Sequence, residues 1–417
     1  MHTKLISISL SPNVFPEDIS AAKTMFSQPS ALIHGADIAR FQETFSRYLD
    51  VEKESVFLFN SGRSALVSLL KAFDINEGDE VLLQAFTCNA VPNPVLWVRA
   101  TPVYVDVNAE TYNIDVTDLE KKITPRAKAI IVQHTFGQTA PLKEILAIAR
   151  ERKLIVIEDC AHALGATHDG KLLGTFGDGA FFSFGRDKVI SSVYGGAAIL
   201  KLQTTNYKLQ TIYNELPYPS VNWVKQQLRH PILMEKLLRW YNTPLTNYGI
   251  GKFLLQCSQA TRFLSKAVHW KEKVGKKPDY FPARLPNALA HLALLQFERL
   301  DAFNSHRREL AEFYFRELQT TNYKLQTLID GHIYLRYPVR HPDAHEIIRR
   351  ARKQGILLGD WYNSVVAPDD TNLENMQYKN GSCPTAERLT KETFNLPTNP
   401  NLSIDDAKRA VEFLKGI

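Results

Sequence analysis

The fold is decided by the stretch Leu154-Ile155-Val156-Ile157-Glu158-Asp159-Cys160-Ala161-His162-Ala163, in which a continuous apolar run ends in two carboxylates. Such a run predicts a strand that is covered on both faces, as in a parallel sheet. Carboxylates at its end are costly unless another group pairs with them. Asp159 is therefore a candidate partner for a cationic heterocycle, such as a protonated pyridine nitrogen, and His162 would touch the same ring. The alternative is that Asp159 caps a helix and His162 is only packed.

Similar β-branched or aromatic runs occur throughout the first two hundred residues. They are Val56–Phe59, Glu80–Leu83, Pro102–Val105, Ala129–Val132, Leu154–Ile157, Ala180–Phe184 and Gly196–Leu200. Helical patterns separate most of them, for example Ser64–Phe73 and Leu142–Arg152. Strands that alternate with helices predict an α/β domain with a mostly parallel, seven-stranded sheet.

The pattern changes in the C-terminal third of the chain. A long amphipathic helix is predicted over Asn287–Glu317, followed by a strand at Ile333–Pro338 and helices at Ala344–Gln354 and Ser403–Leu414. We expect three parts: a large α/β domain at 1–215, a basic helical insertion at 216–280, and a smaller α+β domain at 281–417.

Composition excludes several classes of protein. The 417 residues include 44% hydrophobic and 23% charged residues, as in a packed globular protein. The four cysteines share no short spacing, so we expect neither a disulfide scaffold nor a metal site. The net charge of +6 is modest and does not imply a nucleic-acid partner. The N-terminal apolar stretch is too short and polar for a signal peptide, and no window is long enough for a membrane span, so we expect a cytoplasmic protein.

A second chemical signal lies at the end of the run Val56–Phe59. The residues Asn60-Ser61-Gly62-Arg63-Ser64 join this strand to a helix, so the backbone N–H groups of Gly62 and Arg63 face outward at a positive dipole end. This is a phosphate cradle, although a simple helix cap uses the same residue types.

A third signal follows the run Ala180–Phe184. Lys188 lies just past a buried strand end, where desolvation lowers the pKa of a lysine and provides the neutral amine that a Schiff base requires. Ser183 is placed to give a hydroxyl to a phosphate. The alternative for Lys188 is an ordinary solvated surface lysine.

Together these three signals provide the parts of a pyridoxal phosphate site: a phosphate cradle, an acid for a ring nitrogen and an amine for an aldehyde. From about Ser9 to Leu414 the chain resembles the pyridoxal-phosphate sugar aminotransferases of fold type I, the DegT–DnrJ–StrS family. The motifs that carry the resemblance are SG-x-[ST]-AL at Ser61–Leu66, PVYVDV at Pro102–Val107 with Tyr112–Asp115, IED-x-A-[HQ]-x-x-GA at Ile157–Ala166, SF-x-x-x-K at Ser183–Lys188, the helix at Leu289–Asp301, and CP-x-AE…NLP at Cys383–Pro397.

The resemblance implies a homodimer with shared active sites that moves an amino group, with glutamate expected as the donor, to a keto-sugar on a nucleotide or other carrier. It assigns the covalent cofactor link to Lys188, the pyridine nitrogen to Asp159, the ring hydroxyl to His162, and the phosphate to Gly62, Arg63 and Ser183. A sugar dehydratase or other lyase is the alternative enzyme, but that branch carries His in place of the lysine. A non-catalytic, membrane-associated relative is the alternative from another class.

The chain departs from the family pattern at several positions. Cys88 stands where members carry an aromatic residue that stacks on the cofactor, so either this thiol or Phe86 covers the ring, and we favour Cys88. Arg63 replaces a small hydroxyl residue and adds a cation near the phosphate. Val193–Gly196 replaces Gly-Glu-Gly-Gly, and Pro282 replaces an Asn that reaches the neighbouring subunit.

Two further features are unusual. Residues 220–277 contain 11 Lys and Arg against two Glu, a net charge of +9 beside −3 for the rest of the chain, and three of the five tryptophans, Trp223, Trp240 and Trp270. This composition suits peripheral contact with an anionic membrane at its inner face, a pocket for a diphosphate-bearing substrate, or a dimer face. In addition, the sequence LQTTNYKLQT occurs at both Leu202–Thr211 and Leu318–Thr327; two copies do not make a solenoid.

Overall fold

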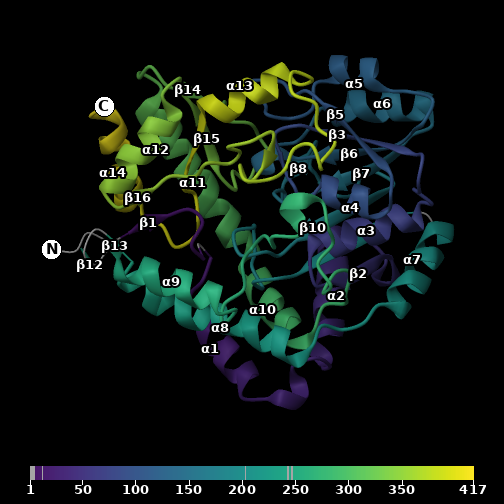
Figure 1. The fold of residues 1–417 in the computed structure, drawn as a ribbon, viewed down its shortest axis with the longest axis horizontal. Helices are drawn as coiled ribbons and strands as arrows, with labels where there is room; N and C mark the ends of the chain where they lie inside the picture. Colours follow the sequence, from purple (N-terminus) through teal and green to yellow (C-terminus); the bar gives the residue numbers. More distant parts are fainter. Residues whose placement is uncertain (1–4, 12, 202, 242–243, 246–247) are drawn as a thin grey trace.

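The computed structural model describes residues 5–11, 13–201, 203–241, 244–245 and 248–417, and a seven-stranded sheet lies at its centre (Figure 1). The strand order is β2-β11-β10-β7-β6-β3-β5. The strands are β2 (Val56–Phe59), β3 (Glu80–Gln84), β5 (Thr101–Val105), β6 (Ala127–Gln133), β7 (Ile155–Asp159), β10 (Gly179–Ser183) and β11 (Gly196–Leu200). Only β11 runs antiparallel to its neighbours in this sheet. The seven predicted runs and the mostly parallel sheet are thus confirmed.

Helices cover both faces of this sheet, as continuous apolar strands require. The helices of the sheet region are α2 (Ala36–Leu49), α3 (Gly62–Ala72), α4 (Pro92–Trp97), α5 (Val116–Lys122), α6 (Leu142–Arg152), α7 (Gln203–Glu215) and α10 (Asn287–Phe297). Successive strand residues point to opposite faces, so Phe181 joins the core on the side of α3 and Phe182 the core on the side of α2.

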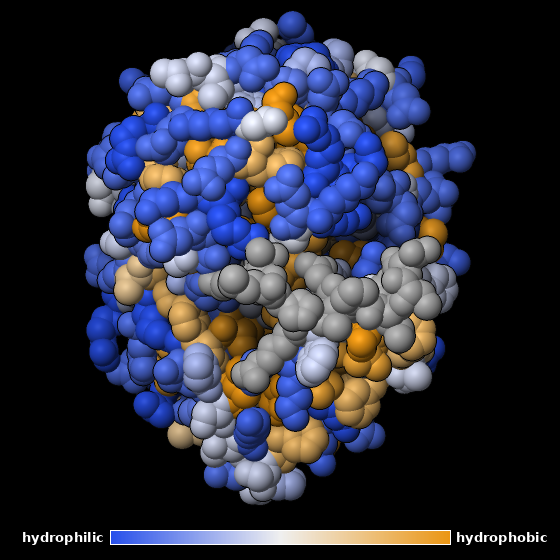
Figure 2. Space-filling model, turned by 90° about the vertical axis from the view of Figure 1, so that its left-hand side faces the viewer, coloured by the Kyte–Doolittle hydropathy of each residue, from blue (hydrophilic) through white to orange (hydrophobic). Residues whose placement is uncertain are grey.

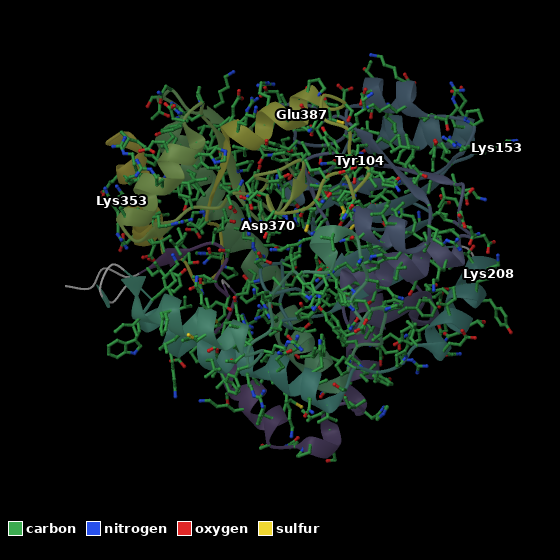
Figure 3. The ribbon with its side chains drawn as sticks, in the orientation of Figure 1. Tyr104, Lys153, Lys208, Lys353, Asp370 and Glu387 are labelled. Atoms are coloured by element: carbon green, nitrogen blue, oxygen red, sulfur yellow. The ribbon has the colours of Figure 1, made fainter. Side chains whose placement is uncertain are left out.

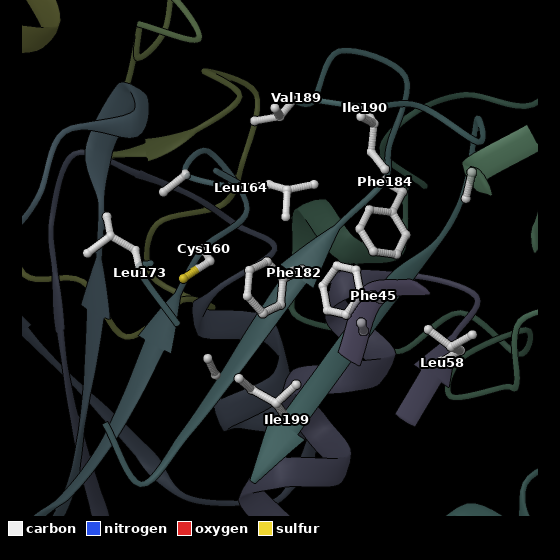
Figure 4. Close-up of a cluster of buried hydrophobic side chains, with 14 of the residues drawn as sticks. Phe45, Leu58, Cys160, Leu164, Leu173, Phe182, Phe184, Val189, Ile190 and Ile199 are labelled. Atoms are coloured by element: carbon white, nitrogen blue, oxygen red, sulfur yellow. The ribbon is translucent and has the colours of Figure 1, made fainter. Parts of the chain in front are cut away.

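The core between α2 and the sheet contains the aromatic cluster of Figure 4. Phe45 of α2 meets Phe182 of β10 edge to face, with ring centroids 5.1 Å apart, and also contacts Phe184. All three side chains are fully buried, and each such side chain stabilises the fold by about 1.5–3 kcal/mol. This packing fixes β10, and with it the residues that follow the end of β10.

The C-terminal part has a sheet and a core of its own. Its elements are α11 (Leu300–Leu318), β14 (Lys324–Leu325), β15 (Tyr337–Arg340), α12 (Ala344–Lys353), β16 (Ile356–Leu357), α13 (Pro384–Glu392), β18 (Thr393–Leu396) and α14 (Ile404–Lys415). The strands β14, β15 and β18 form an antiparallel sheet. The strand predicted at Ile333–Pro338 is present but begins and ends later, as β15 at Tyr337–Arg340. Leu335 lies before it and donates its backbone N–H to the carbonyl of Phe136 in the large sheet region.

The predicted helix Asn287–Glu317 is also not continuous, because α10 and α11 are separated at Glu298 and Arg299. The backbone of Arg299 is not helical, with φ −104° and ψ 5°. Its side chain donates to the carbonyl of Leu295 and pairs with Asp18 of α1 (Pro16–Phe26). The bend separates α10, which packs on α2, from α11, which packs on α14.

Side chains also join the C-terminal part to the edge of the large sheet. Tyr104 of β5 donates its hydroxyl to the carbonyl of Met376 at 2.8 Å and meets the ring of Tyr378 edge to face. Tyr378 in turn donates to Glu387 of α13, and Figure 3 shows Tyr104 just below that helix. A parallel pairing of β17 (Val366–Ala367) with β4 (Thr87–Cys88) adds a second connection.

The described part of residues 216–280 forms a helical layer that packs against α1. It contains α8 (Val221–Arg239) and α9 (Ile250–Ala260), with the short strands β12 (Pro244–Leu245) and β13 (Tyr248–Gly249) between them. The three-part division of the chain stays a prediction. Residues 287–297, which we assigned to the C-terminal part, pack in the core of the large sheet.

Candidate active site

A cavity of about 260 Å³ opens at the carboxyl ends of β2, β7 and β10, the edge where open α/β sheets bind ligands. All seven residues singled out from the sequence line it: Gly62, Arg63, Cys88, Asp159, His162, Ser183 and Lys188. Parallel strands bring their carboxyl ends to one edge, so segments more than a hundred residues apart in the chain meet here.

The anion-binding wall is formed by the start of α3 and the end of β10. Ser61 caps α3, its hydroxyl accepting the N–H of Ser64 at 3.1 Å. The first N–H groups of a helix have no acceptor within it and lie at its positive end. A Cβ on Gly62 would come within 3.1 Å of Cβ of Ser183 and 3.3 Å of the carbonyl oxygen of Phe182, so a side chain at this position would push the turn and the strand apart by a few tenths of an ångström.

Asp159 is buried at the end of β7. Its Oδ1 accepts the N–H of Ala161 at 2.9 Å, and no salt bridge to it occurs within the described part of the chain. Burial raises the pKa of this carboxyl group. The residues that follow form turns, so the alternative of a helix cap does not apply. A desolvated carboxylate without a cation is suited to receive a protonated ring nitrogen.

Lys188 lies at the wall of the same cavity, with its ammonium nitrogen 4.9 Å from the ring centroid of Trp361. Desolvation lowers the pKa of this lysine from its ordinary value, so a larger fraction of the amine is neutral near pH 7. Lys188 is therefore a buried cavity residue, and the alternative of a solvated surface lysine does not apply.

His162 is a neutral ring held in one orientation. Burial lowers the pKa of His162 well below its usual value. Its Nδ1 accepts the N–H of Phe136 at 3.3 Å, which leaves the proton of the neutral ring on Nε2, 3.4 Å from the hydroxyl of Tyr362. The imidazole stacks on Trp361 with centroids 4.9 Å apart and planes 9° from parallel.

The structure separates Cys88 from Phe86. Cys88 lines the cavity, and burial raises the pKa of its thiol, so the sulfur is uncharged. Phe86 is fully buried in an aromatic cluster, stacked on Tyr112 and edge-on to Tyr362, and does not line the cavity.

Sequence reasoning missed the contribution of the C-terminal part. The loop that follows Gly359 brings Trp361 and Tyr362 over the cavity. Arg336 lies 3.2 Å above the centroid of Trp361 and pairs with Asp187 at 3.3 Å. In the sequence, Trp361 and Tyr362 form an aromatic pair in an otherwise polar loop, and such a pair does not indicate which segment it packs against.

A buried cluster beside the site contains the residue types of a metal site, but its carboxylate is already fully hydrogen-bonded within the protein. His134, Glu158 and Cys160 lie close enough to share an ion. However, the carboxylate of Glu158 already accepts the N–H groups of Gly174, Phe176 and Gly177 and the Nε2 of His134. These bonds also compensate the burial of Glu158 and lower its pKa. These hydrogen bonds hold Glu158 near the end of β7, and they thereby position the side chain of the next residue, Asp159.

The guanidinium of Arg63 does not serve as a free cation at the anion-binding wall, because it forms a salt bridge with Glu272. The carboxylate of Glu272 is fully buried, and the guanidinium of Arg63 also lies over the ring of Phe281 at 4.8 Å. The cation predicted near the phosphate is therefore neutralised, and Arg63 offers the wall its backbone N–H.

Glu272→Gln is expected to lower the free energy of unfolding by about 3–5 kcal/mol, because it leaves a largely buried guanidinium without its counter-charge. The double variant Arg63→Met/Glu272→Gln should recover much of that loss, since no uncompensated charge remains. Chemical denaturation monitored by fluorescence measures both. If Glu272→Gln were as stable as wild type, the carboxylate of Glu272 would not be the counter-charge that stabilises the buried guanidinium of Arg63.

Comparisons with known proteins find relatives over nearly the whole chain. The family model of the DegT/DnrJ/EryC1/StrS aminotransferases matches residues 16–229 and 257–415. The chain is 29% identical over 400 residues to the dTDP-3-amino-3,6-dideoxy-alpha-D-galactopyranose transaminase of Aneurinibacillus thermoaerophilus, covering 95% of this chain and 94% of that protein. It is 35% identical over 234 residues to GDP-perosamine synthase of Escherichia coli O157:H7, covering 56% and 60%.

Solved structures share the fold. NtdA of Bacillus subtilis with bound cofactor PMP superposes with a TM-score of 0.76 at 21% identity, covering all of this chain and 85% of that one. The PLP form of Spr1654 of Streptococcus pneumoniae gives a TM-score of 0.74 at 20% identity, covering 99% of this chain and 98% of that one. None of the helices in the described ranges is both long and apolar enough to cross a bilayer. The family resemblance inferred from the sequence is confirmed: the chain belongs to the DegT/DnrJ/EryC1/StrS aminotransferase family.

Proposed function

We propose that this aminotransferase uses pyridoxal phosphate to move an amino group, with glutamate as the expected donor, to a keto-sugar attached to a nucleotide. The observation that carries the proposal is the convergence in one cavity of helix N–H groups, a desolvated carboxylate and a desolvated lysine. The relatives named above support a nucleotide-linked acceptor, since one acts on a dTDP-sugar and one makes GDP-perosamine.

The residues present fit the cofactor. When bound, pyridoxal phosphate supplies an electron sink for bonds to the donor α-carbon. The N–H groups of Gly62 and Arg63 and the hydroxyl of Ser183 would hold the phosphate. Asp159 would pair with the ring nitrogen and keep it protonated, and His162 would lie at the ring hydroxyl. Cys88 would cover the ring with an uncharged thiol.

Lys188 has two tasks in this mechanism. Its Nζ would hold the cofactor covalently when the cofactor is present. As a free amine, the same nitrogen would take the proton from the donor α-carbon and would return a proton to the acceptor carbon. Because burial lowers the pKa of Lys188, a larger fraction of the amine is in the neutral form that accepts a proton.

The proposal is tested by supplying glutamate and a panel of nucleotide-linked keto-sugars to the holoenzyme and detecting amino-sugar nucleotides by mass spectrometry. Formation of an amino sugar together with 2-oxoglutarate supports it. Elimination of water from the sugar without amino transfer would instead identify the lyase alternative.

We also propose that the active form is a homodimer, as the family resemblance implies. Sedimentation velocity of the holoenzyme distinguishes a dimer from a monomer. A cytoplasmic location stays a prediction.

Peripheral membrane contact is the finer proposal for residues 220–277. The apolar patch consists of Trp240, Phe253, Leu254 and Phe263, which are 45–56% exposed. Trp240 directly follows α8, Phe253 and Leu254 lie on α9, and Phe263 follows α9. Figure 2 shows apolar side chains gathered on this face of the molecule. Exposed aromatic and leucine side chains beside a net charge of +9 are typical of contact with anionic lipid.

The cations of α8, namely Lys225, Arg229, Lys236 and Arg239, are less suited to a test of membrane binding than the apolar patch. Lys225 and Arg229 are half-buried against the ring of Phe26, and Arg229 also lies over Phe263. The side chain of Arg239 lies outside the described residues, whereas Lys236 is exposed. Substituting all four would disturb packing as well as charge.

The variant Phe253→Ser/Leu254→Ser should therefore reduce binding to phosphatidylglycerol vesicles about tenfold or more, because each buried apolar side chain contributes about 1.5–3 kcal/mol. Ile329→Ser, which changes an equally exposed residue outside the patch, is the matched control. Co-sedimentation at low salt measures both. Wild-type protein that stays in the supernatant at low salt, with loss of the dimer in the double variant, would identify the patch as a subunit interface.

A further inference from the structure

A second cavity of about 340 Å³ adjoins the catalytic cavity, and we call it the N-terminal cavity because residues 9–11 form one of its walls. The other walls come from α8, from α9 and from the loop after α9. Arg186, Asp187 and Ala267 line both cavities. Because Arg186 and Asp187 directly precede Lys188 in the chain, the boundary between the two cavities lies beside the lysine assigned to catalysis.

Arg186 carries an uncompensated charge at this boundary. It is only 9% exposed, and one amino group of its guanidinium donates to the hydroxyl of Ser265. Its Nε has no hydrogen-bond partner. Burial lowers the pKa of this guanidinium, although Tyr194 and Asp187 partly oppose the effect. A buried cation without a counter-charge is costly, so this position favours the approach of an anion.

The protein itself supplies no counter-charge to Arg186. The carboxylates that line the catalytic cavity are those of Asp159, Asp187 and Asp360, and none of them forms a salt bridge with Arg186 in the described part of the chain. Asp187, the nearest of them in sequence, pairs instead with Arg336 at 3.3 Å. The missing anion is therefore expected from a ligand.

The phosphate cradle does not extend to the N-terminal cavity. Ser61, Gly62 and Ser183 line the catalytic cavity only, whereas Arg186 lines both cavities. An anion bound between Arg186 and the N-terminal cavity is thus a different group from a phosphate on the cradle.

The N-terminal cavity has the polar groups that a carboxylate requires. His230 is only 5% exposed, its Nε2 lies 2.8 Å from the hydroxyl oxygen of Ser11, and its Nδ1 has no partner. Burial, together with Arg186, lowers the pKa of His230 well below its usual value, so the ring is neutral. Lys266 is exposed and forms no salt bridge with any described residue. The apolar walls, which suit the methylene groups of a ligand, are Leu10, Met234 and Leu255.

We propose that Arg186 selects the amino donor by binding the distal carboxylate of a dicarboxylic amino acid, whose side chain extends from Lys188 toward the N-terminal cavity. A guanidinium binds a carboxylate through charge-assisted hydrogen bonds, which are about twice as strong as neutral ones. The motif SF-x-x-x-K at Ser183–Lys188 leaves position 186 open, so this specificity belongs to the chain's own sequence. The proposal rests on the proposed function and names the residue that distinguishes the donor from neutral amino acids of the same size.

Conversion of the holoenzyme's cofactor by an amino acid, followed by absorbance, tests the donor alone, because no acceptor is present. Wild type should react at least about tenfold faster with glutamate than with glutamine, which has the same shape but no charge. Arg186→Met should lower the second-order rate constant for glutamate by about 10–100-fold, the loss expected for hydrogen bonds to a charged group, and leave that for glutamine unchanged. Arg186→Lys should retain part of the preference, because the charge is kept.

Two controls separate an effect on the donor from effects on the cofactor and the fold. Arg284→Met makes the same change at a half-buried arginine that lines neither cavity, and it should react as wild type does. The cofactor retained after dialysis and the midpoint of unfolding should be the same in Arg186→Met and wild type, since the substitution removes a charge that has no counter-charge in the protein.

Equal losses with glutamate and glutamine, or loss of cofactor from Arg186→Met, would overturn the proposal, because Arg186 would then act on the cofactor. An unchanged preference for glutamate in Arg186→Met would overturn it as well. Equally rapid conversion of wild type by glutamine and glutamate would leave the proposed amino transfer intact and refute only the role of Arg186. No conversion of wild type by any amino acid would refute both.

Discussion

Lys188→Ala is expected to reduce amino transfer by at least about a thousandfold, because it removes both the amine that bonds to the cofactor and the group that moves the α-proton. The cofactor should still bind, since the phosphate cradle and Asp159 are separate from the lysine. Steady-state amination and the amount of cofactor retained after dialysis measure the two effects independently.

Lys201→Ala provides the matched control. Lys201 also follows a strand of the central sheet and has a pKa lowered by burial, but it donates to the carbonyl of Phe176 outside the cavity. It should transaminate at the wild-type rate. Full turnover by Lys188→Ala would refute the assignment of the lysine.

Asp159→Asn is expected to slow the proton transfer by about 10²–10⁴-fold, because a neutral amide does not keep the pyridine nitrogen protonated. The fold should be unaffected, because an amide oxygen can still accept the N–H of Ala161. Single-turnover reaction with glutamate, followed by absorbance of the cofactor, isolates this step from binding of the acceptor.

Asp178→Asn is the comparison for this effect. Asp178 accepts the N–H of Val156 at 2.8 Å, near the start of β7, so it tests the same substitution away from the cavity. We expect no change in rate. If Asp159→Asn matched wild type as well, the buried carboxylate would have only a structural role.

Several features of the site could be predicted from the sequence. Apolar runs that end in chemistry-bearing residues gave Asp159, Ser183 and Lys188, and the Ser-Gly turn gave Gly62. Because parallel strands share an edge, finding the strands was enough to bring these residues together. Cys88 lines the cavity and Phe86 does not, whereas the role of the thiol in covering the cofactor ring stays a prediction.

Contacts between distant segments could not be predicted in this way. Trp361, which stacks on His162, and Glu272, which neutralises Arg63, come from segments without local signals that indicate their partners. Their positions depend on how the C-terminal part and the helical layer pack on the sheet, and neither periodicity nor residue type records that packing.

The duplicated segment LQTTNYKLQT shows this limit most directly. Within the described residues the first copy is helical, part of α7, with Tyr207 78% exposed and Leu209 buried. The second copy leaves α11, turns and forms β14, with the equivalent Tyr323 only 9% exposed and its hydroxyl donating to the carbonyl of Leu414. Intrinsic helix preferences differ by less than about 0.7 kcal/mol per ordinary residue, whereas burying one large side chain is worth about 1.5–3 kcal/mol. The sequence alone determined the strands and the chemistry at their ends; tertiary packing decided what the same ten residues become, because burial outweighs local preference.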